Sequence, residues 1–409
     1  MSKKAYTEGV TLTKEQLVLY PSEQLAPLRK KAEKLFIGIP REKSLSENRV
    51  SLRPEAVEIL VRNGHEIRVE TNAGLGAKFT DQQYSEAGAE VCYSSKEVFE
   101  ADIILKIEPP TIEEIEYMRF GRTIVSSLPM ARLNSAYVKA LMQKKCIGIA
   151  YQFIQNKVGE MPIIRSMSEI AGSTVMLVAS EYLSSVHEGK GTILGGITGV
   201  PPTKVVIIGA GTVGEYAART AIGLGAETKI FDKDIYKLRR LKYAVGHQMY
   251  TSTIDAGVLA EAISRADVVI GAMRAERGLA PCVVTDEMVQ DMKPNSVIVD
   301  VSIDQGGVFE TSELTTHENP TFKKHDVIHY CVPNIASRVS RTSSTALSNI
   351  FTPYLMKISK AGGMDEMIFA NKWFMDGVYT YKGSFTNEHL AKKLDMPYKD
   401  LGLLMAARL

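Results

Sequence analysis

Residues 205–234, VVIIGAGTVGEYAARTAIGLGAETKIFDKD, constrain the fold of this 409-residue chain more than any other stretch. An apolar run leads into three glycines with the spacing G-x-G-x-x-G, which are Gly209, Gly211 and Gly214. This pattern predicts a strand, a tight turn, a helix that begins near Thr212 and a second strand. Such a β-α-β unit belongs to an α/β fold with a parallel sheet.

Each part of this unit suits a dinucleotide. The first glycine allows the tight turn, the second lets the backbone approach a pyrophosphate, and the third permits close packing of helix on strand. The helix start at Thr212 and Val213 offers free N–H groups and a positive dipole end to phosphates. Asp232 ends the second strand, where a carboxylate accepts both ribose hydroxyls and repels a 2′-phosphate. The sequence therefore favours an NAD site over a merely structural glycine turn.

Strands alternate with helices on both sides of a Gly/Pro-rich connection at residues 189–202. A helix is expected over residues 54–62, with proline at its first position and glycine just past its end. A longer apolar-faced helix is expected at about 168–187, and helix again after Asn334. Two α/β domains with parallel sheets follow from this alternation. The expected strands are 35–39, 66–70, 102–106, 123–128, 146–151, 204–208, 227–231, 248–251, 267–271, 297–301 and 327–331.

Composition excludes several classes of function. The 49 Lys and Arg residues nearly balance 47 Asp and Glu, for a net charge of +2, so neither nucleic acid nor an anionic membrane is an expected partner. The apolar stretch near the middle is too short to span a bilayer, and the N-terminus lacks a secretion pattern. Cysteines 92, 146, 282 and 331 form no C-x-x-C pair, which favours reduced thiols over a disulfide or metal site. We expect a soluble cytoplasmic protein without a bound metal.

A second reactant would bind to the first alternation. Arg49 follows a strand, with Glu42 and Glu47 beside it, and Lys106 ends another strand before an acid and two prolines. Ligands of open parallel sheets lie outside the carboxyl ends of strands. A fixed arginine and lysine there suit the carboxylate and carbonyl oxygen of a small 2-oxo acid. Solvated surface charges are the equally weighted alternative.

Six stretches in order carry a family resemblance that covers nearly the whole chain after about Leu35. They are GIPREKSLSENRVSLRPEAV, ADIILKIEPP, MSEIAG, VVIIGAGTVG, VDVSIDQGG and YCVPN…RTSSTALSN. Together they resemble the family of alanine dehydrogenases and pyridine-nucleotide transhydrogenase α-subunits. The resemblance implies two Rossmann-like domains with the active site in the cleft between them. It divides the chain into an arm (1–34), a substrate domain (35–165 plus 341–409) and an NAD-binding domain (166–340).

The resemblance also implies roles for individual residues. Arg49 and Lys106 would bind the carboxylate and carbonyl of pyruvate, and Asp304 would exchange protons beside the cofactor. A turn or helix-capping role is the alternative for Asp304. Met167 and the 333–338 loop would line the nicotinamide side. The implied cofactor ligands are Ser168, Gly209, Gly211, Thr212, Val213, Gly214, Asp232, Asp304 and Asn334.

Two branches of the family compete. The dehydrogenases interconvert a 2-oxo acid with ammonia and an L-amino acid, whereas the transhydrogenases pass hydride between cofactors and join a membrane part. Asp304 resembles the dehydrogenase pattern, because the transhydrogenase pattern has an amide there. The chain also lacks the Arg–Gln–Asp loop of the transhydrogenases, and its tail resembles the dehydrogenase C-terminus. These points favour an NAD-dependent L-alanine dehydrogenase that forms a homo-oligomer, commonly a hexamer.

One departure from the family pattern keeps alternatives open. The dehydrogenases usually carry a histidine in the stretch that corresponds to SSLPMA, and this chain has Pro129 there. A missing proton-transfer group would slow the reaction or change the substrate, unless Asp304, Lys106 or Ser127 takes over. The alternatives are a saccharopine-type reductase for another 2-oxo acid and an NAD-binding relative without turnover.

Overall fold

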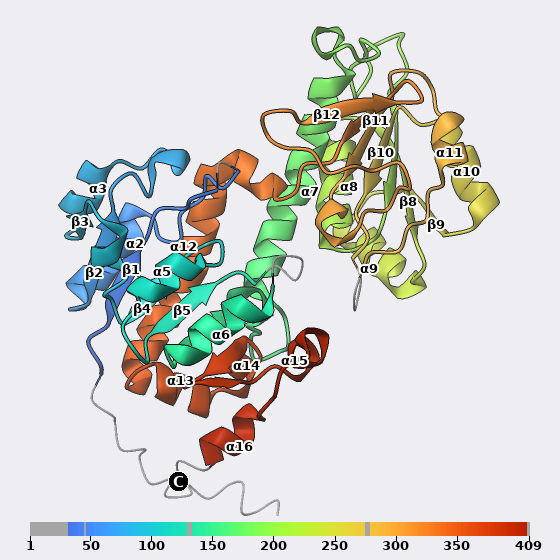
Figure 1. Ribbon diagram of the computed structural model, residues 1–409. Coiled ribbons are helices and arrows are strands. Elements are labelled where there is room, and N and C mark those ends of the chain that lie inside the picture. Colours follow the sequence, from blue (N-terminus) through green and yellow to red (C-terminus); the bar gives the residue numbers. More distant parts are fainter. Residues whose placement is uncertain (1–31, 45, 129–132, 275–278, 407–409) are drawn as a thin grey trace, which may run out of the picture.

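The computed structural model describes residues 32–44, 46–128, 133–274 and 279–406. It consists of two lobes, each built around its own sheet, joined by the long helix α7 (Pro162–Leu183) and by the segment that leads into α12 (Ser340–Ala361) (Figure 1). The expected arm at 1–34 and Pro129 lie almost wholly or wholly outside the described residues. Within the described part, no helix is long and apolar enough to cross a membrane.

The first lobe contains an eight-stranded sheet in the order β15-β14-β6-β5-β4-β1-β2-β3. Strands β1 to β6 pair in parallel, whereas β14 pairs antiparallel with β6 and with β15. The C-terminal tail therefore completes the sheet that the N-terminal half begins. The strands are β1 (Phe36–Ile39), β2 (Glu66–Glu70), β3 (Glu90–Cys92), β4 (Ile103–Leu105), β5 (Thr123–Ser126), β6 (Ile147–Ala150), β14 (Val378–Tyr381) and β15 (Ser384–Phe385).

The second lobe contains a seven-stranded sheet in the order β12-β13-β11-β10-β7-β8-β9. All of its pairs are parallel except the edge pair of β12 with β13. The chain crosses from one half of this sheet to the other beside β7, the position at which open α/β sheets bind nucleotides. The strands are β7 (Lys204–Ile208), β8 (Glu227–Asp232), β9 (Tyr250–Thr253), β10 (Val268–Gly271), β11 (Val297–Asp300), β12 (Thr321–Lys324) and β13 (Val327–Tyr330).

Helices cover both faces of each sheet. The sequence predicts this arrangement, and α2 starts and ends at the expected residues, with Gly64 at φ +86° just past its end. In the first lobe the helices are α2 (Pro54–Arg62), α3 (Asp81–Glu86), α4 (Ser95–Val98), α5 (Ile112–Tyr117), α6 (Ser135–Gln143), α12, α13 (Met364–Ala370), α14 (Lys372–Met375), α15 (Glu388–Leu394) and α16 (Leu401–Ala406). In the second lobe they are α8 (Thr212–Gly223), α9 (Ile235–Val245), α10 (Ala256–Ser264) and α11 (Asp286–Gln290).

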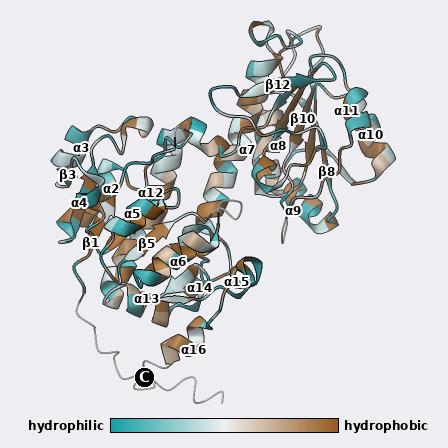
Figure 2. Ribbon diagram, in the orientation of Figure 1, coloured by the Kyte–Doolittle hydropathy of each residue, from teal (hydrophilic) through white to brown (hydrophobic). Residues whose placement is uncertain are grey.

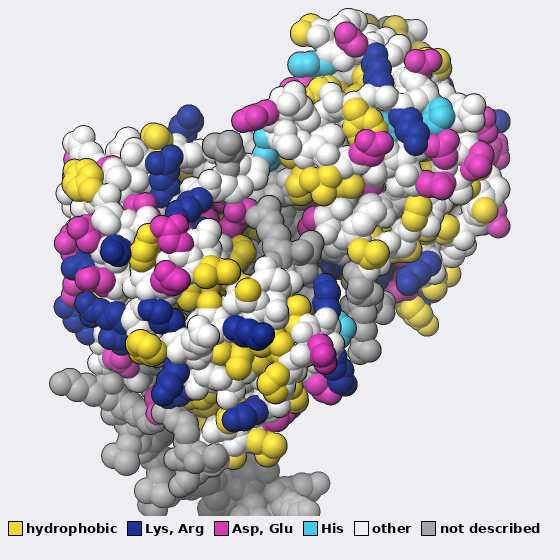
Figure 3. All heavy atoms as spheres, viewed as in Figure 1, with side chains coloured by type: hydrophobic (Ala, Val, Ile, Leu, Met, Phe, Trp, Pro, Cys, Tyr) yellow, Lys and Arg dark blue, Asp and Glu magenta, His cyan; other side chains and the backbone are white. Residues whose placement is uncertain are grey.

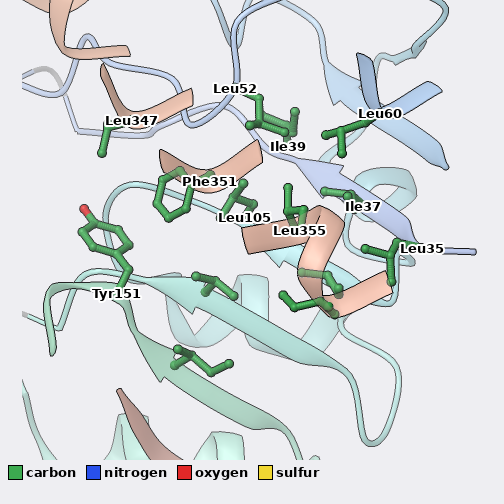
Figure 4. Packing of buried hydrophobic residues seen from close by; sticks show 14 of the residues in the cluster. Leu35, Ile37, Ile39, Leu52, Leu60, Leu105, Tyr151, Leu347, Phe351 and Leu355 are labelled. Atoms are coloured by element: carbon green, nitrogen blue, oxygen red, sulfur yellow. The ribbon is translucent and has the colours of Figure 1, made fainter. Parts of the chain in front are cut away.

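Alternating side chains divide each sheet between two hydrophobic cores. In β4, Ile103 and Leu105 face one core while Ile104 faces the other. Figure 4 shows Leu347, Phe351 and Leu355 of α12 packed onto the first of these cores. The apolar strands lie inside each lobe, and hydrophilic helix surfaces lie outside (Figure 2). The two-sided cover explains why the strands read as nearly continuous apolar runs.

Helix α7 belongs to both lobes. Met167, near its N-terminal end, packs against the first lobe's core, whereas Ala171 to Leu183 pack in the second lobe's core. Gly172 allows close contact with α8, since a Cβ there would lie 2.4 Å from the carbonyl oxygen of Val213. The helix therefore fixes the start of α8 relative to the first lobe. It begins six residues earlier than the sequence predicts.

Candidate functional site

The glycine turn between β7 and α8 has the expected geometry. Gly209 has φ +117°, and a Cβ there would lie 2.4 Å from the carbonyl oxygen of Ala272. A Cβ on Gly214 would lie 1.8 Å from the carbonyl oxygen of Gly209, so helix and strand touch through backbone alone. A Cβ on Gly211 would meet nothing within 4 Å. Open space therefore lies over the second glycine, where a pyrophosphate would need it.

Asp232 lies at the carboxyl end of β8 and is held beside this turn. Its Oδ2 accepts a hydrogen bond from the backbone N–H of Ala210 at 2.7 Å, and its Oδ1 accepts from that of Asp234 at 2.8 Å. The residue is only 4 % exposed. Each carboxylate oxygen keeps a further lone pair for a ribose hydroxyl. The turn, the start of α8 at Thr212 and this fixed carboxylate together fit the phosphate and ribose of a dinucleotide.

Lys106 is buried in the first lobe, at the carboxyl end of β4. The residue is 2 % exposed, and its Nζ donates to Oε2 of Glu42 at 2.7 Å. Glu42 also accepts backbone N–H bonds from Ile107 at 2.6 Å and Glu108 at 3.2 Å. The interpretation of Lys106 as a solvated surface charge is therefore wrong. A buried, hydrogen-bonded ion pair holds the ammonium group in one place.

Arg49 is buried in a second ion pair. Its Nε donates to Oε1 of Glu47 at 2.7 Å, and its Nη2 donates to Oε2 at 2.6 Å. Its Nη1 donates to the Sδ of Met167 at 3.4 Å, and a thioether is a weak acceptor. The guanidinium therefore retains one nitrogen whose partner a carboxylate can readily replace.

The electrostatics of the two pairs differ. Burial raises the pKa of Glu42 to about 7, although the Lys106 ammonium group opposes this shift. For Glu47, burial also favours the neutral acid, but the bidentate contact with Arg49 outweighs it and lowers the pKa. Burial disfavours charge on Lys106, yet the attraction of Glu42 prevails and raises its pKa. Both cations keep their charge at neutral pH, as ligands of an anionic substrate must.

Glu47 also joins the first lobe to the second. The Nδ2 of Asn334, which follows β13 and has φ +59°, donates to Oε2 of Glu47 at 2.8 Å. Ser337, in the short η5 turn Ile335–Val339, donates from its Oγ to the carbonyl of Ser46 at 2.8 Å and accepts from the N–H of Asn48 at 2.9 Å. The loop expected to line the cofactor is thus bonded to the loop that carries Arg49.

Asp304 lies on the short helix η4 (Ile303–Gln305), after β11. The residue is exposed, but protein atoms surround its inner side, and the resulting loss of hydration raises the pKa of its carboxyl group. The nearby charge of Asp300 adds to this shift, whereas Arg274 opposes it. A solvent-accessible carboxyl group with a raised pKa suits proton exchange better than a simple turn residue would.

The loop that carries Asp304 is fixed by Asp300, at the end of β11. Asp300 is 1 % exposed, and its carboxylate accepts from the N–H of Ser302 at 3.0 Å, the N–H of Val308 at 2.8 Å and the Oγ of Ser312 at 2.7 Å. Sequence reasoning missed this residue. Its signal was available, because an aspartate at the end of an apolar strand before a Gly-Gly turn commonly closes the following loop.

The structure brings some expected site residues together and leaves others apart. Arg49 contacts Met167 directly and reaches Asn334 through Glu47. Ser168 follows Met167 on α7 and is partly buried. Among the described residues, Asp304 makes no hydrogen bond or ion pair with Arg49 or Lys106, so any cooperation between them would run through substrate.

One stability prediction follows from the Glu47 pair. Glu47→Gln should lower the free energy of unfolding by about 2–3 kcal/mol, because losing one member of a buried ion pair leaves the other charge uncompensated. Glu58→Gln, which alters the exposed Glu58–Arg62 pair, should cost less than about 1 kcal/mol. Urea unfolding at pH 7 measures both, and equal losses would contradict the assignment. Because the pKa of Glu47 is lowered in the fold, its contribution is present above the unfolded-state pKa and disappears as the pH falls through the folded-state value.

Together these features define a two-lobed α/β protein with a dinucleotide turn in one lobe and a buried pair of anion-binding cations in the other. Sequence profiles give the same result, since "Alanine dehydrogenase/PNT, N-terminal domain" matches residues 38–171 and "Alanine dehydrogenase/PNT, C-terminal domain" matches 175–388. The chain belongs to the alanine dehydrogenase/PNT family.

Individual relatives agree with this membership. Alanine dehydrogenase of Methanococcus maripaludis and alanine dehydrogenase 2 of Staphylococcus aureus are each 40 % identical over 366 residues, which cover 89 % of this chain and 98 % of the relative. A solved L-alanine dehydrogenase superposes with a TM-score of 0.82 at 34 % identity, covering 87 % of this chain and 98 % of the other. A transhydrogenase from Sinorhizobium meliloti gives 0.72 at 26 % identity, with 86 % and 99 % coverage. The fold class expected from sequence is confirmed, with antiparallel strands added at the sheet edges.

Proposed function

We propose that this chain is an NAD-dependent L-alanine dehydrogenase that interconverts L-alanine, NAD and water with pyruvate, NADH and ammonia. The observation that carries the proposal is the buried Arg49 and Lys106, fixed at strand ends of one lobe and linked through Glu47 to the loop after β13 of the other. The identity of 40 % with alanine dehydrogenases supports the same activity. The division into an arm (1–34), a substrate domain (35–165 plus 341–409) and an NAD domain (166–340) is part of this proposal.

Two cations bind the 2-oxo acid in this scheme. Arg49 receives the carboxylate on Nη1, in place of the Met167 sulfur, while Glu47 keeps the other two nitrogens in position. Lys106 donates to the carbonyl oxygen and withdraws electron density from C2. Ammonia adds to C2, and the oxygen leaves as water to give an iminium ion. Arg49 and Lys106 thereby hold C2 in the orientation that hydride transfer requires.

Asp304 handles the protons of this cycle. In amination it gives a proton to the departing oxygen, and in deamination its carboxylate takes one from the attacking water. The raised pKa brings proton exchange nearer to neutral pH. NAD, when bound, would accept or supply the hydride. Its proposed ligands on this chain are Ser168, Gly209, Gly211, Thr212, Val213, Gly214, Asp232, Asp304 and Asn334.

The test of this proposal is NADH oxidation in the presence of ammonia and pyruvate. Ammonia-dependent loss of absorbance at the NADH band, with L-alanine as product, is the expected result. Hydride transfer between NADH and a second nicotinamide cofactor without consumption of pyruvate would favour the transhydrogenase branch instead. Binding of NADH without turnover of any 2-oxo acid would indicate the non-enzymatic alternative.

Assembly and location complete the proposal. The family resemblance predicts a homo-oligomer, commonly a hexamer, which light scattering coupled to size exclusion would measure. All four cysteines are free thiols, and three of them are buried, which agrees with a reducing compartment such as the cytoplasm. Among the described residues, no group of three or more His, Cys, Asp and Glu side chains is placed to hold a metal ion.

The cofactor assignment yields a second prediction. NADH should bind at least about ten-fold more tightly than NADPH, because the Asp232 carboxylate and a 2′-phosphate repel each other at short range. Asp232→Ser should narrow this ratio. Asp255→Ser, which removes a helix-capping carboxylate from α10 in the same lobe, should leave the ratio unchanged. Fluorescence titration measures all four dissociation constants, and equal affinity of the unmodified protein for both cofactors would overturn the assignment.

A further inference from the structure

A cavity of about 400 Å³ lies beside Lys106, at the carboxyl ends of β4 and β5. Its walls come from the loop after β1, the loop between β4 and α5, and the segment that leads into α6. The cavity is far larger than a methyl group, which is similar in size to a water molecule with its share of about 30 Å³ in the liquid. Its volume falls in the range of about 300–1,000 Å³ that small-molecule sites occupy.

The lining of this cavity is mainly apolar. The apolar residues are Pro109, Pro110, Ile112, Leu128, Leu133 and the ring of Tyr137. The hydroxyl group of Tyr137 is paired with that of Tyr379 at 3.0 Å. Lys43 lies at the wall, and its ammonium group is 3.5 Å from a carboxylate oxygen of Glu114. Figure 3 shows hydrophobic side chains gathered on this face of the lobe, over α5 and α6.

The cavity adjoins the part of the substrate that distinguishes one 2-oxo acid from another. Lys106 lines the cavity and, under the proposed function, binds the carbonyl oxygen on C2. The substrate side chain is attached to that same carbon. A substituent that leaves C2 beside Lys106 can therefore extend into the cavity, whereas the carboxylate turns toward Arg49.

We propose that this cavity is a side-chain pocket, and that the enzyme accepts 2-oxo acids with aliphatic side chains of three or four carbons as well as pyruvate. This inference rests on the proposed function. The apolar walls favour aliphatic over carboxylate-bearing side chains, since a buried second carboxylate would find Lys43 already paired. A pocket shaped for methyl alone would reject each added methylene by steric overlap.

The test compares reductive amination of pyruvate, 2-oxopentanoate, 4-methyl-2-oxopentanoate and 2-oxoglutarate by kcat/KM. We expect 4-methyl-2-oxopentanoate to react with at least about one tenth of the kcat/KM of pyruvate, because one methylene is worth about ten-fold or more in an apolar pocket and the longer chain gains contacts. 2-Oxoglutarate should be at least about ten-fold poorer than 4-methyl-2-oxopentanoate. A branched acid below one tenth of pyruvate, or a preference for 2-oxoglutarate, would overturn the inference.

A pocket-filling variant provides the second arm. Ile112 borders the cavity and is 45 % exposed, so Ile112→Trp narrows the pocket without overpacking a core. The kcat/KM ratio of 4-methyl-2-oxopentanoate to pyruvate should fall by about ten-fold or more. Ile59→Trp, at a similarly exposed position on α2 away from the cavity, should leave the ratio unchanged. Equal ratios in the two variants would contradict the pocket assignment.

Calorimetric binding separates failure of the inference from failure of the proposed function. Turnover of pyruvate alone, with no binding of the branched acid, would leave the proposed function standing and sink the pocket. Binding of the branched acid that Ile112→Trp abolishes, with no turnover of any 2-oxo acid, would support the pocket and contradict the dehydrogenase. Absence of both turnover and binding for every acid would overturn both.

Discussion

Lys106→Met should lower kcat/KM for pyruvate by roughly 10²–10³-fold, the loss typical of removing one donor from a developing oxyanion. The buried ammonium group donates to Glu42 at 2.7 Å and is held where the carbonyl oxygen would bind, so methionine keeps much of the volume but no charge. The affinity for NADH should change little, because the glycine turn and Asp232 lie in the other lobe. Steady-state kinetics and fluorescence titration measure the two quantities.

The folded state should survive this change. Glu42 loses its partner, but burial already raises the pKa of Glu42 to about 7, so the carboxyl group can take up a proton and become neutral. Lys190→Met is the matched control, because Lys190 is also paired with a carboxylate, that of Asp267 in the second lobe. That control should retain pyruvate turnover. A Lys106→Met protein that keeps its melting temperature but loses NADH binding would place this lysine in the cofactor site instead.

The local pattern of apolar residues and glycines predicted most of the fold. The strand at 66–70 and the helix at 54–62 have the expected bounds, and α8 begins at Thr212 as the glycine spacing requires. Edge strands were missed. β12 and the β14–β15 pair are short and antiparallel, and their place in a sheet depends on distant partners such as β6, about 230 residues away in the sequence. Periodicity within one segment carries no information on such pairing.

The candidate site was predictable in kind but not in its ion pairs. The position of Arg49 and Lys106 after strands identified them as possible ligands, but strand position alone could not distinguish buried cations from solvated ones. Burial and partners decide that question, and Glu42 lies 64 residues from Lys106 in the sequence. The link from Glu47 to Asn334 was also beyond sequence reasoning, because it depends on how the two lobes meet. The gap at Pro129 lies outside the described residues, so its effect stays a prediction.

Asp304→Asn is expected to lower amination of pyruvate and deamination of L-alanine by about 10²–10⁴-fold, the usual contribution of a positioned acid or base. The amide keeps the shape of the side chain but exchanges no proton. The buried Asp300 should continue to hold the loop through its bonds to Ser302, Val308 and Ser312, so the fold should persist. Steady-state rates in both directions, with NADH affinity as the control, test this expectation.

The pH profile distinguishes proton transfer from a merely structural role for Asp304. The pKa of this carboxyl group is raised, so the carboxylate that deamination needs appears only as the pH rises through that raised value. The kcat/KM for L-alanine should therefore fall on the acid side of this pKa in the unmodified enzyme, and Asp304→Asn should lose that limb along with the rate. Asp291→Asn, which alters an exposed carboxylate at the end of α11, should keep both the rate and the profile. Robust amination of pyruvate by Asp304→Asn with an unchanged pH profile would sink the proposed proton path and leave Lys106, buried beside the same carbonyl, as the next candidate.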